Sequence, residues 1–295
     1  MRVSDIAYGF KRYALHERGM RPRSYKSITS SLEMLCAWAD TEELAQLTHA
    51  TIKEFLYWGR EEKAWEARTF RNHRQYLKSY FDWCVNQRYL STNPILGIAK
   101  PKLPARLPRC LNRNHTRKIL DYPRWHKWRY EFETIRNEAI LYCLVFTGLR
   151  LQEMLNLELS DINLKSREIL VRQGKGQKDR VVPIHPRLVR VLQNYLAARK
   201  LRGKQGRHVF VSVGSDKSMG GKAVRRVCRT VSAGTKVYFT PHMLRHTFGR
   251  LMVEAGVDIF KIKEMMGHSS ISTTQIYLSV STENLKHTLE EIDLV

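Results

Sequence analysis

The sequence predicts a mainly α-helical protein with a small β-sheet, divided into two domains. Three observations lead to this prediction. The first 90 residues show helical spacing of apolar side chains and contain no strand-like run. A proline-rich basic stretch follows, and the remainder mixes helical patterns with one pair of β-branched runs. A chain of 295 residues that is 43% hydrophobic is long enough to bury two cores.

Residues 1–97 are expected to form a domain of four helices. In chain order, these are a helix holding Tyr8, Phe10 and Leu15, a helix opened by Pro22, and helices over residues 51–60 and 67–85. The last of them carries apolar residues on one side and basic residues on the other. Its apolar positions include Phe70, Leu77, Phe81 and Trp83.

Residues 98–112 are expected to link the domains, because the stretch 91–110 has four prolines and no periodicity. Residues 113–280 then form an α+β domain. Its hairpin is predicted over residues 167–184, where two β-branched runs flank a glycine-containing turn. Helices are predicted over residues 116–122, 136–148, 187–200, 223–232, 241–256 and 258–267, around Tyr277, and over 282–293.

The charge of the chain predicts an anionic partner. Lys and Arg number 51 against 28 Asp and Glu, a formal charge of +23. Basic residues are spread from Arg2 to Lys286, which favours a long double-stranded nucleic acid over a membrane surface. The linker would follow a phosphate backbone with a domain on each side of the duplex, as a clamp. The candidate DNA-binding residues are Arg68, Arg71, Arg74, Lys78, Lys100, Lys102 and Arg106. On one helix alone, solvation would explain such a face.

Cysteine spacing and hydropathy indicate the compartment. The five cysteines are far apart and never in C-x-x-C spacing, which favours a reducing environment over disulfides or thiolate–zinc sites. There is no signal-peptide pattern, and the longest apolar run, residues 139–146, is too short to span a bilayer. A cytoplasmic, nucleoid-associated protein that does not use a membrane is expected.

The stretch "TPHMLRHTF" predicts an anion site at a helix start. Thr240 is suited to cap the helix and Pro241 to begin it, so that His242 and Arg245 project from one face. His242 and His246 also have the spacing of a zinc-binding H-E-x-x-H helix. The Glu of that motif is missing and an arginine would stand beside the metal, so phosphate is favoured and no metal site is expected.

Two further motifs carry charge. In "TGLRLQEML", Gly148 ends one helix and Arg150 opens the next, three residues before Glu153. This pair is either a surface ion pair or an arginine that a carboxylate aims at a phosphate. In "GKGQKDR", Lys175 lies at the hairpin tip, where it is either solvated or able to deliver a proton. A nucleotide loop is excluded there, since the G-x-x-x-x-G-K-[ST] pattern is absent.

The stretch "GHSSISTTQIYLSV" holds one of thirteen tyrosines, for which packing is the simplest role. Ser272 and Gln275 fit a capping box, which predicts a short helix that starts at Thr273 and has Tyr277 in its second turn. Because that helix is poorly apolar, Tyr277 is expected near the surface and mobile. His268 precedes it by nine residues.

The order of these groups resembles the tyrosine recombinase (integrase) family, most closely its Xer-type branch and the compact recombinases of transposons and integrative elements. Arginine, a hairpin lysine, His-x-x-Arg, Gly-His and tyrosine follow one another along the chain. The likeness is strongest in "HMLRHTFGRLMVEAGVDIFKIKEMMGHSSISTTQIYLSV", extends through "TGLRLQEMLNLELSDI" and "STNP", and covers nearly the whole chain.

The resemblance implies a site-specific recombinase with no cofactor, metal or ATP, in which Tyr277 attacks a DNA phosphodiester and joins to the 3′ phosphate. Arg150 and Arg245 would hold the phosphate oxygens, and Lys175 would protonate the departing 5′ oxygen. His242 would handle the tyrosine proton, His268 would donate to a phosphate oxygen, and Glu153 would orient its neighbours.

The resemblance also implies a tetramer on two DNA sites with inverted repeats. The tail, residues 281–295, would dock on a neighbouring protomer through a stripe of Leu285, Leu289 and Ile292, although covering its own domain is the alternative. Resolution of chromosome or plasmid dimers, transposon resolution and element integration or excision remain open, as does a need for accessory proteins. The rival functions are a non-catalytic DNA clamp, a type IB topoisomerase-like enzyme and a metal-dependent nuclease.

Overall fold

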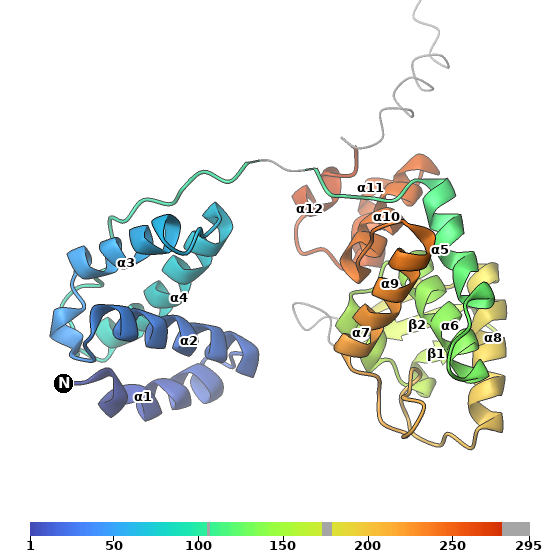
Figure 1. Ribbon diagram of the computed structural model, residues 1–295, viewed down its shortest axis with the longest axis horizontal. Helices are drawn as coiled ribbons and strands as arrows, with labels where there is room; N and C mark the ends of the chain where they lie inside the picture. Colours follow the sequence, from blue (N-terminus) through green and yellow to red (C-terminus); the bar gives the residue numbers. More distant parts are fainter. Residues whose placement is uncertain (105–106, 173–178, 279–295) are drawn as a thin grey trace, which may run out of the picture. The chain divides into compact units, whose positions relative to one another are not determined.

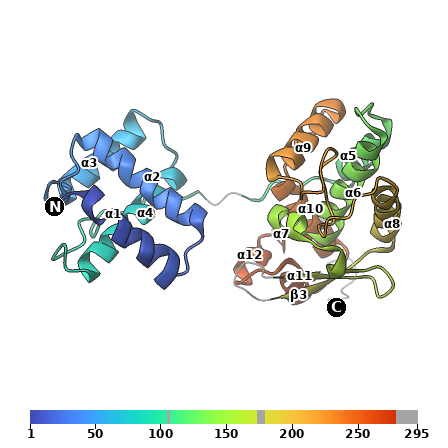
Figure 2. The ribbon, with the colours of Figure 1, turned by 90° about the horizontal axis from the view of Figure 1, so that it is seen from below.

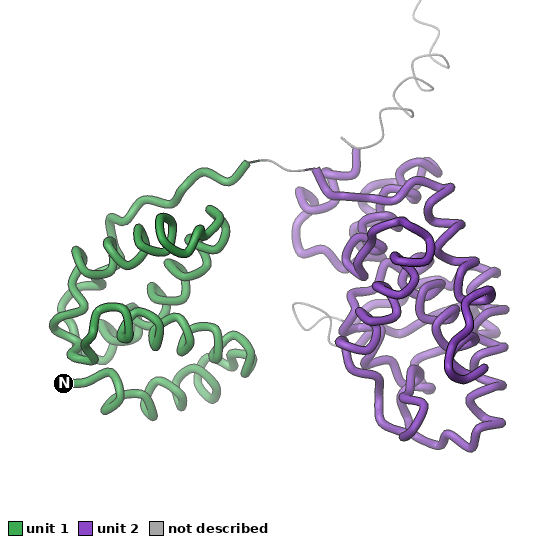
Figure 3. The backbone as a smooth tube through the Cα atoms, viewed as in Figure 1, with its two compact units in different colours: residues 1–105 green, residues 106–295 purple. Residues whose placement is uncertain are grey.

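The computed structural model describes residues 1–104, 107–172 and 179–278 (Figure 1). The chain divides into two compact units, residues 1–105 and 106–295, and the division falls within the expected linker (Figure 3). Each unit has its own apolar core and is described by itself. Within the described residues, none of the helices has the length and apolar character needed to cross a bilayer.

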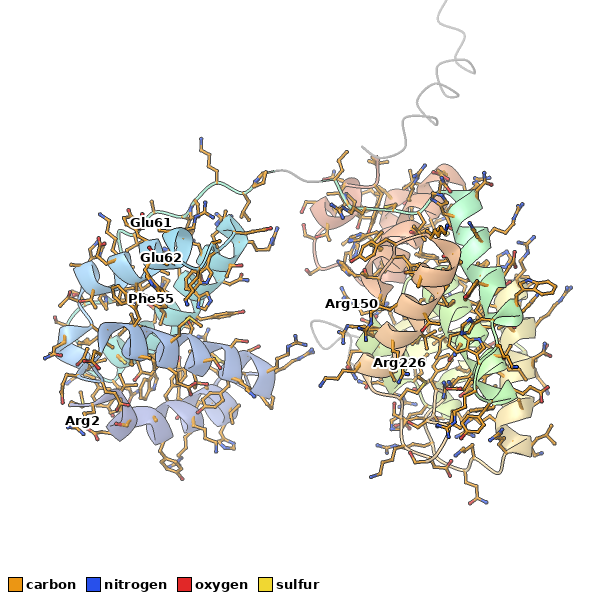
Figure 4. The ribbon with its side chains drawn as sticks, in the orientation of Figure 1. Arg2, Phe55, Glu61, Glu62, Arg150 and Arg226 are labelled. Atoms are coloured by element: carbon orange, nitrogen blue, oxygen red, sulfur yellow. The ribbon has the colours of Figure 1, made fainter. Side chains whose placement is uncertain are left out.

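Unit 1 is helical, as expected. Its elements are α1 (Val3–Arg12), a π-helical turn (Tyr13–Glu17), α2 (Pro22–Ala39), a 3-10 turn (Leu44–Gln46), α3 (His49–Glu61) and α4 (Ala67–Asn86). Pro22 is the first residue of α2, as predicted, while Leu15 lies in the π-helical turn and not in α1. The core includes Phe55, which is labelled in Figure 4, together with the predicted apolar side of α4.

The first residue of the expected linker, Ile98, packs on unit 1 together with the residues just before it. Ile95 and Ile98 are buried in its core. Asn93 holds the turn, since its amide donates to Asp82 at 2.7 Å and its oxygen accepts from the backbone N–H of Ile95 at 2.9 Å. Residues 93–98 therefore belong to the folded domain, because their apolar side chains complete its core.

Arg74, one of the predicted DNA contacts, is engaged inside unit 1. Only 7% of this residue is exposed, and its Nε donates to the carbonyl oxygen of Ile98 at 2.7 Å. It thus anchors residues 93–98 to α4. Among the other candidate DNA-binding residues of α4, Arg68 is exposed and Arg71 is half-buried. Lys78 forms an ion pair with Asp82 at 2.6 Å.

Unit 2 is an α+β domain with a three-stranded sheet. Its elements are α5 (Arg113–Trp125), α6 (Glu131–Thr147), α7 (Leu151–Asn156), a 3-10 turn (Leu159–Asp161), β1 (Ile162–Asn163), β2 (Glu168–Val171), β3 (Arg180–Pro183), α8 (Pro186–Leu201), α9 (Gly221–Thr235), α10 (Pro241–Glu254), α11 (Ile259–Met266) and α12 (Ser272–Gln275).

The predicted hairpin is confirmed in its strands. The sheet order is β1-β2-β3, and β2 and β3 are antiparallel with Ile169 opposite Val182 and Val171 opposite Arg180. The tip, residues 173–178, lies outside the described residues. The strand β3 packs against α11, which brings the first residue of β3 near the end of α11 (Figure 2).

The helix α6 lies in the core of unit 2, between α5, α8 and α10. It ends at Gly148, as predicted, with φ of 61°, the left-handed conformation that glycine adopts without strain. A Cβ at Gly148 would lie 2.3 Å from Phe248 Cδ1, so the tight turn also lets α10 approach. Around Phe248, a small separate apolar cluster joins α10, α11 and Tyr277.

Candidate active site

The start of α7 holds an arginine and a glutamate together, a contact that both sequence interpretations share. Arg150 stands at the N-cap of α7 (Figure 4). Its backbone N–H donates to Glu153 Oε2 at 2.8 Å and its Nη1 to Glu153 Oε1 at 2.7 Å. Its Nη2 donates to the carbonyl oxygen of Gly267 at 2.9 Å. The guanidinium is thus fixed from two sides while 28% of the side chain stays exposed.

A second arginine, which sequence analysis missed, completes this network. Arg180 on β3 donates through Nη2 to Glu153 Oε2 at 2.8 Å and through Nε to the carbonyl oxygen of Met265 at 2.9 Å. Burial opposes ionisation of Glu153, but hydrogen bonds from Arg180 and Arg150 outweigh it and lower the pKa of this carboxyl to about 2. Glu153 therefore orients two arginines.

Arg245 lies one turn into α10, whose start follows the prediction. Thr240 Oγ1 accepts the backbone N–H of Met243 at 3.2 Å and Pro241 is the first helical residue. The guanidinium of Arg245 is buried, with Nη1 donating to the carbonyl oxygen of Gly148 at 2.6 Å and Nη2 to that of Met266 at 2.7 Å. Burial lowers the pKa of Arg245 to about 10, so it remains a cation at pH 7.

His268 follows Gly267, which ends α11 with φ of 64°. The ring is half-buried, and its Nδ1 shares a hydrogen bond of 2.8 Å with Thr274 Oγ1. Burial and then the nearby Arg245 and Arg150 lower the pKa of His268 to about 3. The imidazole is therefore neutral at pH 7.

The environment of Tyr277 differs from the prediction in two ways. Ser272 lies inside α12, its backbone N–H donates to Ser270 Oγ at 3.3 Å, and the helix has no capping box and ends at Gln275. The side chain of Tyr277, expected near the surface, is fully buried. Its ring packs in the apolar cluster of α10 and α11, which a local pattern could not reveal.

The hydroxyl of Tyr277 meets a histidine that was not among the expected catalytic residues. Tyr277 Oη and His246 Nδ1 share a hydrogen bond of 2.8 Å. The ring of His242 lies next to His246, with 4.4 Å between centroids, and the His268 ring is 6.4 Å from that of Tyr277. Burial raises the pKa of Tyr277 to about 12, so the phenol keeps its proton. In the sequence, the spacing of His242 and His246 matched only a zinc motif, which was rejected, and it gave no sign that His246 contacts a tyrosine.

The site suits an anion. Arg150 and Arg180 pair with the carboxylate of Glu153, and Arg245 lies in the field of these three groups. Burial, and then the nearby Arg245 and Arg150, lower the pKa of His242. Arginine forks match the oxygens of a phosphate. Among the described residues, no group of three or more His, Cys, Asp or Glu could hold a metal ion.

The described part of unit 2 thus brings together Arg150, Glu153, His242, Arg245, His268 and Tyr277. Lys175, Arg106 and the tail 281–295 lie outside the described residues. Lys100 and Lys102 are exposed after the folded part of unit 1.

Sequence comparison places both units in one family. The Phage integrase family profile matches residues 110–284, and the profile of the N-terminal SAM-like domain of phage integrases matches residues 10–90. The tyrosine recombinase XerA of Pyrococcus horikoshii is 34% identical over 200 residues, 67% of this chain and 66% of that protein. XerC of Shigella flexneri serotype 5b is 29% identical over 280 residues, 94% of this chain and 92% of XerC.

Solved structures share the fold. XerH bound to a palindromic difH substrate, a post-cleavage complex, gives a TM-score of 0.77 at 21% identity, over 95% of this chain and 82% of XerH. The Tn1549 transposon integrase in complex with transposon right end DNA gives 0.73 at 19% identity, over 99% of both chains. The chain belongs to the phage integrase family and is a tyrosine recombinase of the Xer-like type.

Proposed function

We propose that the chain is a site-specific recombinase that cuts and rejoins DNA through a covalent 3′-phosphotyrosine at Tyr277. The main support is that a tyrosine hydroxyl lies beside the histidines of α10 in the same cluster as Arg150 and Arg245. Family membership and the DNA complexes of related proteins agree with this proposal.

The scissile phosphate binds between Arg150 and Arg245. Each guanidinium has five N–H donors, and the hydrogen bonds described above use two of those on each arginine. The remaining donors can take non-bridging oxygens and offset the charge of the pentacoordinate transition state. Because the carbonyl oxygens and Glu153 already orient both groups, little reorganisation accompanies the reaction.

The chemical step exchanges one phosphorus–oxygen bond for another. Tyr277 Oη forms a bond to phosphorus while the bond to the 5′ oxygen breaks, and Lys175 gives that oxygen a proton. The phenol proton passes to the histidines of α10, where His242 was expected to act. A phosphotyrosine retains the energy of the broken bond, so a new 5′ hydroxyl can reverse the step without ATP.

Recombination requires two DNA sites with inverted repeats and four protomers. We assign the tail 281–295 to docking on a neighbouring protomer. An open cavity of about 850 Å³ in unit 2, with Leu120, Phe146, Leu251 and Met252 among its lining residues, could accept an apolar helix stripe. Deleting residues after 281 should impair synapsis more than binding to one half-site, and normal synapsis by the truncated chain would argue against the assignment.

Covalent trapping tests the proposed chemistry. A nicked suicide substrate carrying candidate inverted repeats should give a protein–DNA adduct with the wild-type chain, unaffected by chelator, and none with Tyr277→Phe. Binding without an adduct would indicate a non-catalytic clamp. Relaxation of supercoiled DNA without strand exchange would indicate the topoisomerase-like alternative, and loss of activity in chelator would indicate a metal-dependent nuclease.

A further inference from the structure

The hydroxyl of Tyr277 is held inside unit 2. Its side chain is fully buried, and Oη lies 2.8 Å from His246 Nδ1. A buried hydroxyl that lost its partner would be costly, so this hydrogen bond has a strong influence on where the phenol rests. His246 extends from α10, a fourteen-residue helix in which it lies one residue after Arg245. The acceptor is thus attached to the same rigid element as one of the phosphate-binding arginines.

The ring of Tyr277 packs against α10 at Gly249, where the missing side chain leaves a notch. Gly249 lies inside this helix, where glycine is less favourable than alanine. A Cβ at this position would lie 2.6 Å from Tyr277 Cε2 and 2.7 Å from Cζ, distances that a real side chain does not reach. Gly249 follows His246 by three residues, so the acceptor and the notch share one face of α10. Together they define both the position and the direction of the phenol.

We propose that His246 is a positioning residue for the nucleophile, whose Nδ1 accepts the phenol hydrogen of Tyr277 while the notch at Gly249 seats its ring. This inference rests on the proposed function, in which Tyr277 attacks the phosphate. It assigns to His246 the contact with the tyrosine that the family resemblance assigned to His242.

The protonation states agree with a holding role. Burial, then His242 and Arg245, lower the pKa of His246 to about 4, so a neutral ring with its proton on Nε2 can accept at Nδ1. The phenol, with a raised pKa, is the donor. A phosphate bound at Arg150 and Arg245 would offset the positive field that acts on His246. Before it arrives, the proton stays on Tyr277 and the pair holds the oxygen in place.

A measurement without DNA tests the contact itself. We would place 3-fluorotyrosine at position 277 of the full chain and record its ¹⁹F NMR shift. His246→Leu and Gly249→Ala should both move the signal toward that of solvent-exposed fluorotyrosine, while His246→Asn, whose amide oxygen can replace Nδ1, should keep it near the wild-type value. The controls are His115→Leu, an exposed histidine of α5, and Gly9→Ala, where a Cβ meets only ordinary contacts at 3.4 Å.

A kinetic arm links the contact to chemistry. In single-turnover adduct formation on a suicide substrate, His246→Leu should slow the rate roughly 10- to 100-fold with an unchanged Kd for DNA, and His246→Asn should recover most of it. A wild-type rate in His246→Leu, or an unmoved ¹⁹F signal, would overturn the inference. If His246→Leu does not fold, His246→Asn decides. A folded His246→Asn protein whose ¹⁹F signal moves toward that of solvent-exposed fluorotyrosine and whose rate falls roughly 10- to 100-fold would overturn the inference. Absence of any wild-type adduct would refute the proposed function, whereas the ¹⁹F result would still decide the contact.

Discussion

Two buried arginines, one in each unit, have similar local surroundings and different expected roles. Arg74 donates to the carbonyl oxygen of Ile98, and Arg245 donates to those of Gly148 and Met266. Burial lowers the pKa of both guanidiniums. The difference lies in their neighbours. Arg74 secures residues 93–98 on α4, whereas Arg245 lies in the field of two further arginines near Tyr277. The ionisable groups around Arg245, and not its burial, therefore distinguish it from Arg74.

The largest effect is expected from Arg245→Lys. An ammonium cannot reach two carbonyl oxygens and a phosphate with fork geometry, so transition-state stabilisation is lost. Adduct formation on a suicide substrate should fall roughly 100- to 1000-fold. The matched control is Arg250→Lys in the same helix, where the arginine pairs with Glu254 at 2.6 Å. A rate within threefold of wild type for Arg245→Lys would remove the distinction between the two buried arginines.

Next comes a pH effect on stability that depends on Glu153. Its folded-state pKa of about 2 lies below the usual pKa of 4.5 for a glutamate, so its contribution to stability is present above pH 4.5 and is lost as the pH falls toward 2. The loss should be on the order of 2 kcal/mol. Urea unfolding of wild type and Glu153→Gln at pH 5 and pH 3 measures it as the difference between their pH slopes. Parallel slopes would contradict the ion-pair network.

A smaller effect on activity is expected from Arg180→Lys. Arg180 touches Glu153 and the carbonyl oxygen of Met265, so its loss should displace Arg150 without removing a phosphate ligand. The rate of adduct formation should fall about tenfold, with DNA affinity changing less. Arg172→Lys is the control, because Arg172 pairs with Asp161 and makes its ion pair away from Glu153. Equal effects of the two substitutions would show that Arg180 acts only through stability.

The smallest effect on DNA cleavage is expected in unit 1. Arg74→Met should destabilise this unit by about 1 to 3 kcal/mol, since the carbonyl oxygen of Ile98 loses its buried donor. It should leave the salt dependence of DNA binding unchanged. Arg68→Ala, at an exposed position of the same helix, should lower the salt slope of DNA binding by about one without affecting stability. Urea unfolding and binding at several salt concentrations separate the outcomes, and a changed salt slope in Arg74→Met would restore its predicted DNA contact.

Local patterns predicted most elements of the fold. The four helices of unit 1, the hairpin strands, the helix stop at Gly148 and the helix start at Thr240 and Pro241 all depend on residues within a turn or two of one another. Short-range hydrogen bonds and side-chain periodicity determine such features, and both leave recognisable patterns in the sequence.

The order of Arg150, Arg245, His268 and Tyr277 along the chain was likewise sufficient to indicate the family. Tertiary structure alone decided which groups touch. The bonds of Arg74 to Ile98, of Arg180 to Glu153 and of His246 to Tyr277 join residues 24, 27 and 31 positions apart. The capping pattern at Ser272 failed, and Tyr277 became buried, because packing against α10 and α11 outweighs a local preference of a four-residue helix. Contacts at such separations depend on how whole elements pack, which no single stretch of sequence encodes.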